Sequence, residues 1–303
     1  MNVLVTGGAG LIGMALRSAL AARGHAVTAI DITDFGRGDA ELNIVGLHDH
    51  AELEALTTAK NIDAIIHCGA ISGPMMAKGQ PLVMVDVNID GTAVLLDLAR
   101  VNAMRRFVFC SSISVYGNVG AAAITEDIPL RPTSVYGATK VACEQLIQGF
   151  AHEYGLDGVS LRIGRVFGPY RRANCYLGSM IRDAAAGNAT RIPCDPQFIY
   201  HYVHVDDVAA ALIAALEART SHGREYNVGS GEALTMPQIA AIASREIPGA
   251  MVELVPGADD VPDVQTVFDV SRIARDLGWH PRLNLARGLQ SYRRAIEAGC
   301  AAS

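Results

Sequence analysis

Lysine is scarce in this chain of 303 residues, and acidic residues outnumber basic ones. Lys60, Lys78 and Lys140 are its three lysines, and 25 lysines and arginines stand against 31 aspartates and glutamates, so the formal net charge is −6. Proteins that bind nucleic acids or anionic membranes need a basic surface that neutralises phosphate groups. The charge balance therefore argues against a nucleic-acid partner and against a membrane partner.

Long apolar runs, secretion signals and paired cysteines are also lacking. No window approaches the roughly 18 uninterrupted apolar residues of a transmembrane helix. The N-terminus has no basic segment followed by a long apolar one, as a signal peptide would. The six cysteines are scattered without a C-x-x-C pair, and most lie in apolar surroundings, as buried free thiols do. We therefore expect a cytoplasmic protein without structural zinc or any other metal.

The first half of the chain alternates short apolar runs with amphipathic stretches. Helical patterns lie between the runs, among them 83–102 and 135–154, and a last one covers 285–297. The apolar runs, rich in β-branched residues, cover 2–6, 26–31, 63–68, 106–111 and 158–163. Continuous apolar strands separated by helices are typical of a parallel sheet covered on both faces. The pattern predicts a doubly wound α/β sheet of the Rossmann type.

This alternation breaks after about residue 164, where prolines and turn-like stretches interrupt it. We expect residues 1–164 to form a dinucleotide-binding domain and residues 165–303 to form mainly a smaller, mixed α/β substrate lobe. A strand-like run at 200–205 leads into a helical pattern at 206–216. Segments within about 200–230 are expected to return to the first domain, so the boundary is not one clean cut.

A glycine-rich turn follows the first predicted strand and precedes a helix. Gly7, Gly10 and Gly13 form G-x-x-G-x-x-G, which permits a tight turn and lets the backbone approach a pyrophosphate at a helix N-terminus. Asp31 ends the second strand, where a carboxylate accepts hydrogen bonds from both ribose hydroxyls and repels a 2′-phosphate. The pattern predicts a dinucleotide site that favours NAD, although Arg37 lies close enough to leave NADP open.

Tyr136 and Lys140 form Y-x-x-x-K on the predicted helix 135–154. One helical turn brings both side chains to the same face, where the ammonium favours the phenolate form of the tyrosine. A phenolate can remove a carbinol proton while a hydride leaves for the cofactor. Ser111 and Ser112 lie at the carboxyl end of a predicted strand, where doubly wound sheets place their ligands. The alternative for the helix pair is structural, with the tyrosine packed under the lysine stem.

With these residues the sequence resembles the extended short-chain dehydrogenase/reductases, the NAD-dependent epimerase/dehydratase group. The matching segments follow the family's order along nearly the whole chain: VTGGAGLIG (5–13), HCGA (67–70), NIDGT (88–92), SSISVYG (111–117), YGATK (136–140), LRIGRVFGP (161–169), YVHVDDVA (202–209), NVGSG (227–231) and LGWHP (277–281). The resemblance implies that Ser112 is the catalytic hydroxyl, Tyr136 the acid/base and Lys140 its partner. It implies cofactor contacts from Gly7, Gly10, Leu11, Ile12, Asp31, Asn43, Ile44, Cys68, Gly69, Ala70, Asn88 and Lys140.

The smaller lobe departs from the pattern of the nucleotide-sugar members, which hold a diphosphate there with basic and amide groups. Arg165 stands where the family has Asn, Tyr200 replaces an Arg, and no Lys or Arg occurs from 246 to 271. Because a buried diphosphate needs close cationic or N–H partners, this deficit argues against a nucleotide sugar. Four arginines remain as candidates for binding an anion in another pose: Arg165, Arg171, Arg172 and Arg182. The alternative is that they only form a solvated face.

Two segments, HCGAIS (67–72) and LRIG (161–164), resemble those of uronate dehydrogenases, the members that act on free sugar acids. By this resemblance Ser72 lines the substrate pocket, and by position Ser114 and Arg165 are weaker candidates. The expected function is hydride transfer between a sugar or sugar-acid carbinol and NAD. The alternative is a nucleotide-sugar 4-epimerase of the UDP-glucose type with tightly bound NAD.

Two further expectations follow from the resemblance. A dehydratase is not expected, because Ile113 and Ser114 stand where such relatives carry an Asp–Glu pair. A homodimer is expected, because the helices at 83–100 and 138–154 correspond to those that form a dimer interface in many relatives. Packing on the sheet explains the apolar faces of these helices equally well.

Overall fold

The computed structural model describes residues 1–73, 76, 79–120, 123–172, 175–219, 225–258 and 263–298. A parallel sheet forms its centre, with strands β1 (Asn2–Thr6), β2 (Ala26–Asp31), β3 (Leu42–Ile44), β4 (Ala64–His67), β5 (Arg106–Ser112), β7 (Gly158–Ile163) and β12 (Glu225–Val228). Seven strands pair in the order β12-β7-β5-β4-β1-β2-β3. The predicted doubly wound α/β fold is confirmed.

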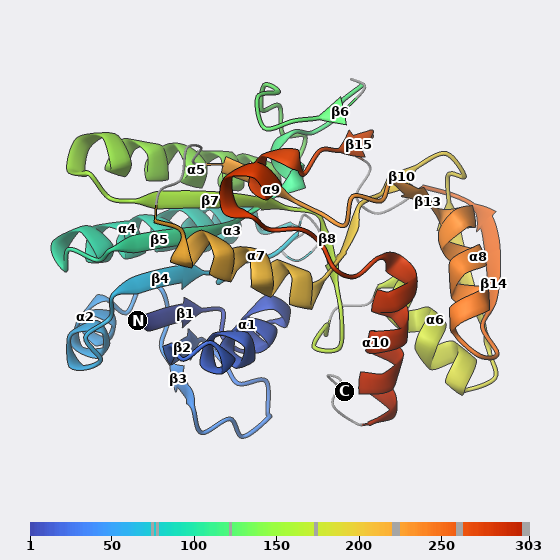
Figure 1. Cartoon of the computed structure of the whole chain (residues 1–303), viewed down its shortest axis with the longest axis horizontal. Coiled ribbons are helices and arrows are strands. Elements are labelled where there is room, and N and C mark those ends of the chain that lie inside the picture. Colours follow the sequence, from blue (N-terminus) through green and yellow to red (C-terminus); the bar gives the residue numbers. More distant parts are fainter. Residues whose placement is uncertain are drawn as a thin grey trace.

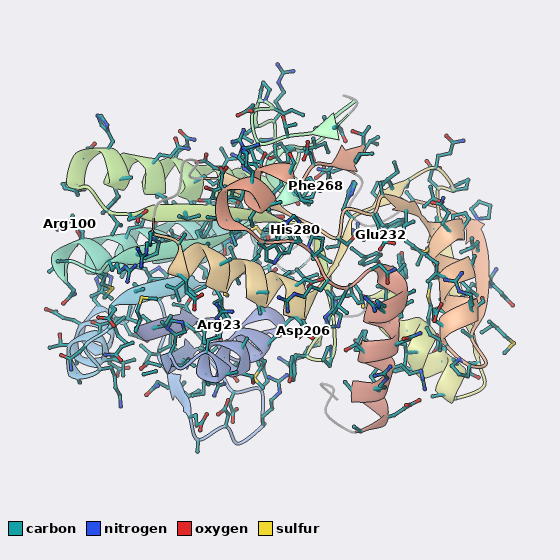
Figure 2. All side chains as sticks on the ribbon, in the orientation of Figure 1. Arg23, Arg100, Asp206, Glu232, Phe268 and His280 are labelled. Carbon is teal, nitrogen blue, oxygen red and sulfur yellow. The ribbon has the colours of Figure 1, made fainter. Side chains whose placement is uncertain are left out.

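Helices cover both faces of this sheet (Figure 1). Their bounds are α1 (Leu11–Ala22), α2 (His50–Ala59), α3 (Pro81–Val85), α4 (Gly91–Val101), α5 (Val135–Tyr154), α7 (Val205–Glu217) and α9 (Ser271–Leu277). α1 and α7 pack against each other on one face, and α4 and α5 pack together on the other. Arg23, labelled in Figure 2, donates a 3.0 Å hydrogen bond from Nε to Glu217 and so joins the ends of α1 and α7.

The central strands bury both of their faces. Along β1, Val3 and Val5 belong to the core under α1 and α7, while Leu4 between them belongs to the core under α4 and α5. In β5, Val108 faces the first core and Phe107 the second. Successive strand residues point to opposite faces, so an uninterrupted apolar run fills two cores at once.

A second group of elements lies on the right in Figure 1, beyond the carboxyl ends of the central strands. It contains α6 (Tyr176–Ala185), β9 (Ala189–Cys194), α8 (Met236–Glu246), β14 (Met251–Pro256) and α10 (Leu285–Glu297). The three helices and the paired strands β9 and β14 enclose a separate apolar core. Glu232, labelled in Figure 2, accepts a 2.6 Å hydrogen bond from the N–H of Leu285 and fixes the start of α10.

Three short strand pairs lie outside the large sheet. They are β8 (Arg165–Phe167) with β11 (Tyr202–His204), β10 (Ile199–Tyr200) with β13 (Leu234–Thr235), and β6 (Ala123–Ile124) with β15 (Val267–Phe268). The expected continuous strand at 200–205 is wrong, because His201 interrupts it and the two halves pair with different strands. The carbonyl oxygen of His201 accepts a 2.7 Å hydrogen bond from the N–H of Arg165 at this break.

The chain passes between the groups several times. After β11 it enters α7 and β12 of the large sheet, and then returns through β13 to α8 and β14. The division into folding units at residue 164 stays a prediction. Among the described residues, no helix combines the length and the apolar character that crossing a membrane requires.

Candidate active site

A cavity of about 1250 Å³ lies at the carboxyl ends of the central strands, between the sheet and the second group of elements. Its volume exceeds the roughly 300–1,000 Å³ of a usual small-molecule pocket. The crevice at the carboxyl ends of the strands is where doubly wound sheets bind their ligands. The cavity therefore has room for a dinucleotide and a second ligand beside it.

The glycine-rich turn forms one wall, with Gly7, Gly10, Leu11 and Ile12 lining the cavity. A Cβ on Gly13 would lie 2.1 Å from the carbonyl oxygen of Gly7, and a Cβ on Gly7 would lie 2.7 Å from the backbone nitrogen of Gly69. Only glycine lets the turn pack this closely on α1 and on the segment after β4. Because Gly10 has no side chain to cap α1, the first N–H groups of the helix can receive a phosphate.

Asp31 lies at the end of β2 and lines the same wall. Its carboxylate accepts hydrogen bonds from the backbone N–H groups of Ala9 at 3.1 Å and Ile32 at 2.8 Å. Partial burial nevertheless raises the pKa of Asp31. Arg37 donates from Nη1 to the carbonyl oxygen of Ala9 at 2.7 Å, so both charged residues hold the glycine-rich turn. The turn, the helix start and the carboxylate together fit a dinucleotide.

Cys68, Gly69 and Ala70 follow β4 and line the cavity beside the glycine-rich turn. The thiol of Cys110 on β5 donates to the sulfur of Cys68 at 3.3 Å, and this contact together with burial raises the pKa of Cys68. The N–H of Gly69 donates to the hydroxyl of Thr6 on β1 at 3.0 Å. The segment after β4 is thus held by both neighbouring strands.

Three predicted cofactor residues, all within the described part of the chain, lie away from the cavity wall. Asn43 donates to the carbonyl oxygen of Ala29 at 3.0 Å, and Ile44 is 56% exposed on β3. Buried Asn88, in a π-helical turn between α3 and α4, accepts from the N–H of Ile71 at 2.8 Å. The geometry gives Asn88 the role of holding the loop that carries Ser72.

Tyr136 and Lys140 meet on the cavity wall near the start of α5. The helix begins at Val135 because the hydroxyl of Ser134 caps it, accepting from the N–H of Gly137 at 3.1 Å. The Lys140 Nζ lies 5.8 Å from the centroid of the Tyr136 ring. Both side chains are buried, with 8% and 4% of their surface exposed. The helix therefore presents a phenol and an ammonium to the cavity side by side.

Ser112 ends β5 and lines the cavity together with Ser114. Its hydroxyl oxygen accepts a 3.2 Å hydrogen bond from the N–H of Ser114 at the start of a short 3₁₀ turn. A Cβ on Gly137 would lie 2.4 Å from the carbonyl oxygen of Ser114, so α5 packs directly on this turn. The fold brings the three predicted catalytic residues to one wall, and their roles stay predictions.

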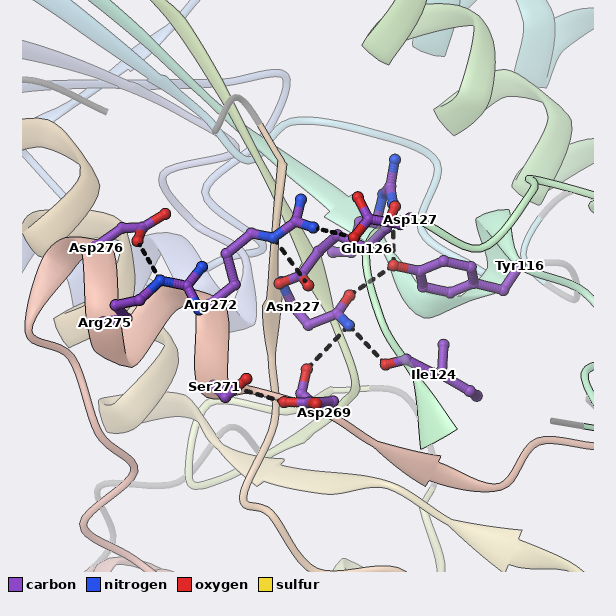
Figure 3. Close-up of polar contacts among 11 residues, drawn as sticks. Tyr116, Ile124, Glu126, Asp127, Asn227, Asp269, Ser271, Arg272, Arg275 and Asp276 are labelled. Atoms are coloured by element: carbon purple, nitrogen blue, oxygen red, sulfur yellow. Dashed lines mark hydrogen bonds and ion pairs between the residues drawn. The ribbon is translucent and has the colours of Figure 1, made fainter. Parts of the chain in front are cut away.

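A buried polar network supports the strands behind this wall. Arg162 on β7 pairs with Glu144 on α5 at 2.8 Å and donates to the Tyr116 hydroxyl at 2.9 Å. Figure 3 shows the continuation, in which the Tyr116 hydroxyl donates to Asn227 at 2.7 Å and Asn227 donates to the carbonyl oxygens of Ile124 and Asp269. The network joins α5, β7 and β12 to the segments that carry Tyr116 and Asp269, and leaves these polar groups satisfied.

Five arginines also line the cavity. It is lined by the three predicted substrate residues and four further arginines, namely Ser72, Ser114, Arg165, Arg171, Arg172, Arg182 and Arg191. The arginines come from β8, the segment after it, α6 and β9. The stretch from 246 to 271, which has no basic residue, contributes only Asp263 and Gln265 to the wall among its described residues. Positive charge for an anionic ligand is therefore present, supplied by elements other than that stretch.

Some wall residues carry no signal in the sequence. Phe35 and Arg191 lie in segments without a motif, and folding alone brings them to the cavity.

His201 also lines the cavity, and burial together with the charge of Arg165 lowers the pKa of His201 to about 4. The ring is therefore neutral at ordinary pH.

Comparisons with a family model, with curated proteins and with solved structures all point to one family. A model of the NAD dependent epimerase/dehydratase family matches residues 3–229. A UDP-glucose 4-epimerase from Mycolicibacterium smegmatis is 31% identical over 315 residues, covering 95% of this chain and 96% of that protein. The crystal structure of a UDP-glucose 4-epimerase with UDP-glucose from Thermotoga maritima has a TM-score of 0.89 at 26% identity and covers 99% of each chain. The structure of MoeE5 in complex with UDP-glucuronic acid and NAD has a TM-score of 0.89 at 28% identity, covering 99% of this chain and 100% of that one.

These similarities correct one expectation. The sequence favours a dehydrogenase of free sugars or sugar acids over an epimerase, but these three relatives are named as UDP-glucose 4-epimerases or hold UDP-sugars. The local resemblance to uronate dehydrogenases is not supported. The physical reason is that the stretch 246–271 is not the source of positive charge in the cavity: the candidates Arg165 and Arg182 line it, joined by Arg191 of β9.

Proposed function

Because the chain belongs to the NAD dependent epimerase/dehydratase family, we propose that it is a nucleotide-sugar 4-epimerase of the UDP-glucose type. NAD is the cofactor of this family, and when bound it supplies a hydride acceptor that can return the hydride to the same sugar. The observation that carries the proposal is the set of arginines that line the same cavity as Tyr136 and Ser112. A diphosphate needs such cationic partners, whereas an uncharged sugar does not.

The roles of the wall residues follow from their positions. Tyr136 takes the proton of the sugar C4 hydroxyl at its phenolic oxygen and later gives a proton back. Ser112 hydrogen-bonds the C4 oxygen from the end of β5, and Lys140 places a positive charge beside the phenol. Arg165 and Arg182 hold the diphosphate. With the nucleotide held, the keto sugar can turn and present its opposite face before the hydride returns.

We also propose a homodimer formed through the helices on the α4 and α5 side. Large apolar side chains are exposed on this side, among them Leu82 (79%), Val101 (62%) and Tyr154 (56%). Exposed large apolar side chains on these helices support association through this side. Light scattering of the purified protein tests this, and a monomeric mass would contradict it.

The function is tested by incubating the protein and NAD with separate substrates: free sugars, sugar acids and UDP-sugars. The proposal expects chromatography to show conversion of a UDP-sugar into its C4 epimer, with no net rise in absorbance at 340 nm. NADH accumulating with a free sugar or sugar acid, together with no change in any UDP-sugar, would overturn it. Tyr136→Phe serves as the control, because a contaminating epimerase would be unaffected by this change.

A further inference from the structure

A contact between two cavity residues joins the cofactor side to the substrate side. The guanidinium carbon of Arg172 lies 3.7 Å from the centroid of the Phe35 ring. Phe35 belongs to the segment after β2, next to Asp31, and Arg172 belongs to the segment after β8. Both side chains are exposed, Phe35 by 38%, so the contact lies at the rim of the cavity and not in its depth.

The segment that carries Phe35 is built to hold this residue in place. Phe35 has a φ of 57°, an unfavourable conformation for a bulky residue. The carboxylate of Asp34 accepts hydrogen bonds from the N–H groups of Gly36 and Gly38, both at 2.8 Å. The Thr33 hydroxyl accepts from the N–H of Phe35 at 3.0 Å. These bonds fix the turn. They hold the backbone of Phe35 in its strained, left-handed conformation.

The same segment is anchored to the dinucleotide site. Arg37 bonds the carbonyl oxygen of Ala9 in the glycine-rich turn, and its guanidinium carbon lies 6.0 Å from the Phe35 ring centroid. Asp39 forms an ion pair with Arg17 of α1. The ring of Phe35 is therefore placed by the elements that would hold the dinucleotide.

The segment that carries Arg172 is also tied down. The N–H of Arg171 donates to the carbonyl oxygen of Gly168 at 3.2 Å, and Nη1 of Arg171 donates to the carbonyl oxygen of Val166 on β8 at 2.9 Å. A guanidinium over an aromatic face is attracted by the ring quadrupole, even at an exposed site. The contact thus connects two anchored segments, one from each side of the cavity.

We propose that Phe35 and Arg172 form a clasp that retains the dinucleotide in the cavity during turnover. This inference rests on the proposed epimerase function, in which the dinucleotide must stay until the keto sugar has been reduced again. A dehydrogenase, by contrast, must release its reduced dinucleotide after every cycle. Parting of Phe35 and Arg172 opens the rim next to Asp31, so the clasp slows dissociation of the dinucleotide without touching the reacting atoms.

The clasp is tested by the dissociation rate of NAD, measured without any sugar by displacement of fluorescent NADH or by filtration of labelled NAD. Phe35→Leu keeps an apolar side chain without a ring face, and Arg172→Gln removes the charge. Each change is expected to raise the rate about two- to fivefold. NAD is expected to dissociate from the double variant no faster than from the faster of the two single variants, because both changes remove the same contact. Arg245→Gln, at an arginine of α8 that pairs with Glu246, is the matched control and should leave the rate unchanged.

Rates equal to wild type in both single variants would overturn the clasp, and so would effects that multiply in the double variant. Because no sugar is present, this result is independent of the substrate. Epimerase activity at saturating NAD tests the proposed function separately. If the clasp and the proposed function are both correct, the Phe35→Leu variant loses epimerase activity on dilution into buffer without NAD and regains it when NAD is added.

Discussion

Glu144 on α5 accepts a 2.5 Å hydrogen bond from the hydroxyl of Ser111, near the end of β5. One turn earlier on the helix, Lys140 donates a 2.8 Å hydrogen bond to the carbonyl oxygen of Cys110. Tyr136 lies one turn earlier again, so Tyr136, Lys140 and Glu144 lie on one face of α5, beside the end of β5. The two bonds fix the position of α5 along β5, and with it the position of the phenol.

Glu144→Gln tests how much stability this arrangement provides. Glutamine keeps the size of the side chain but leaves the guanidinium of Arg162, 4% exposed, without its charged partner. Breaking a buried ion pair in this way costs about 3–5 kcal/mol. We expect the free energy of unfolding in urea to fall by about that amount. Glu297→Gln, which breaks an exposed pair with Arg293, is the control and should leave the urea midpoint nearly unchanged, while equal midpoints for both variants would contradict the expectation.

Tyr136→Phe removes the hydroxyl that transfers the proton and keeps the ring that packs in the wall. General acid–base catalysis contributes about 10²- to 10⁴-fold to a rate. We expect kcat with a UDP-sugar to fall by at least about 100-fold, with an unchanged melting temperature and unchanged NAD affinity. A kcat close to that of wild type would remove Tyr136 from the mechanism.

Asp31→Asn tests which dinucleotide the cavity selects. The carboxylate is held by the N–H groups of Ala9 and Ile32, and a charged acceptor contributes about 1.5–3 kcal/mol to a hydrogen bond. We expect NAD to bind about 10- to 100-fold more weakly to the variant. We also expect the preference for NAD over NADP to shrink, since the charge that repels a 2′-phosphate is gone. Titration calorimetry with both dinucleotides measures this, and an unchanged ratio of affinities would assign the selection to other residues.

His67 makes the fold sensitive to acid. The ring is 1% exposed between Thr6 and Thr92, and burial, with a contribution from Lys140, lowers the pKa of His67 to about 3. In the unfolded chain histidine takes up a proton below about pH 6.5, whereas folded His67 stays neutral. The free energy of unfolding should therefore decrease as the pH falls from about 6.5 towards 3, by about 1.4 kcal/mol per pH unit from this residue.

Urea unfolding at a series of pH values measures this dependence. His67→Gln should have a shallower pH dependence than wild type, because the group that resists protonation in the folded state is absent. Exposed His50 provides the matched control, and His50→Gln should keep the wild-type slope. Equal slopes for wild type and His67→Gln would contradict the assignment.

The parts of the fold that the sequence predicts are those fixed by local pattern. The expected bounds of α5 agree with the structure because Ser134 caps its start and Gly155, with a φ of 73°, ends it. The helix expected at 83–102 is interrupted by the π-helical turn Asp86–Asp90, which places Asn88 under the loop of Ile71. No periodicity in the sequence marks this turn.

The charge of the candidate site was harder to predict, because it depends on which segments the fold brings together. Arg165, Arg182 and Arg191 belong to three different elements and share one cavity wall. The absence of basic residues between 246 and 271 describes one short part of that wall, while Arg165 and Arg182 are basic candidates in the sequence and Arg191 carries no signal there. The glycine-rich turn and the Tyr136–Lys140 pair were predictable, since each is a compact motif within one element.

The most direct measurement uses UDP-glucose with deuterium at C4, incubated with the protein and an excess of free NAD. A sugar-nucleotide 4-epimerase with a retained cofactor predicts that the epimerised product keeps the deuterium at C4 and that no free deuterated NADH accumulates. Deuterated NADH in solution, formed in proportion to an oxidised product, would contradict it and restore the dehydrogenase as the function of this chain.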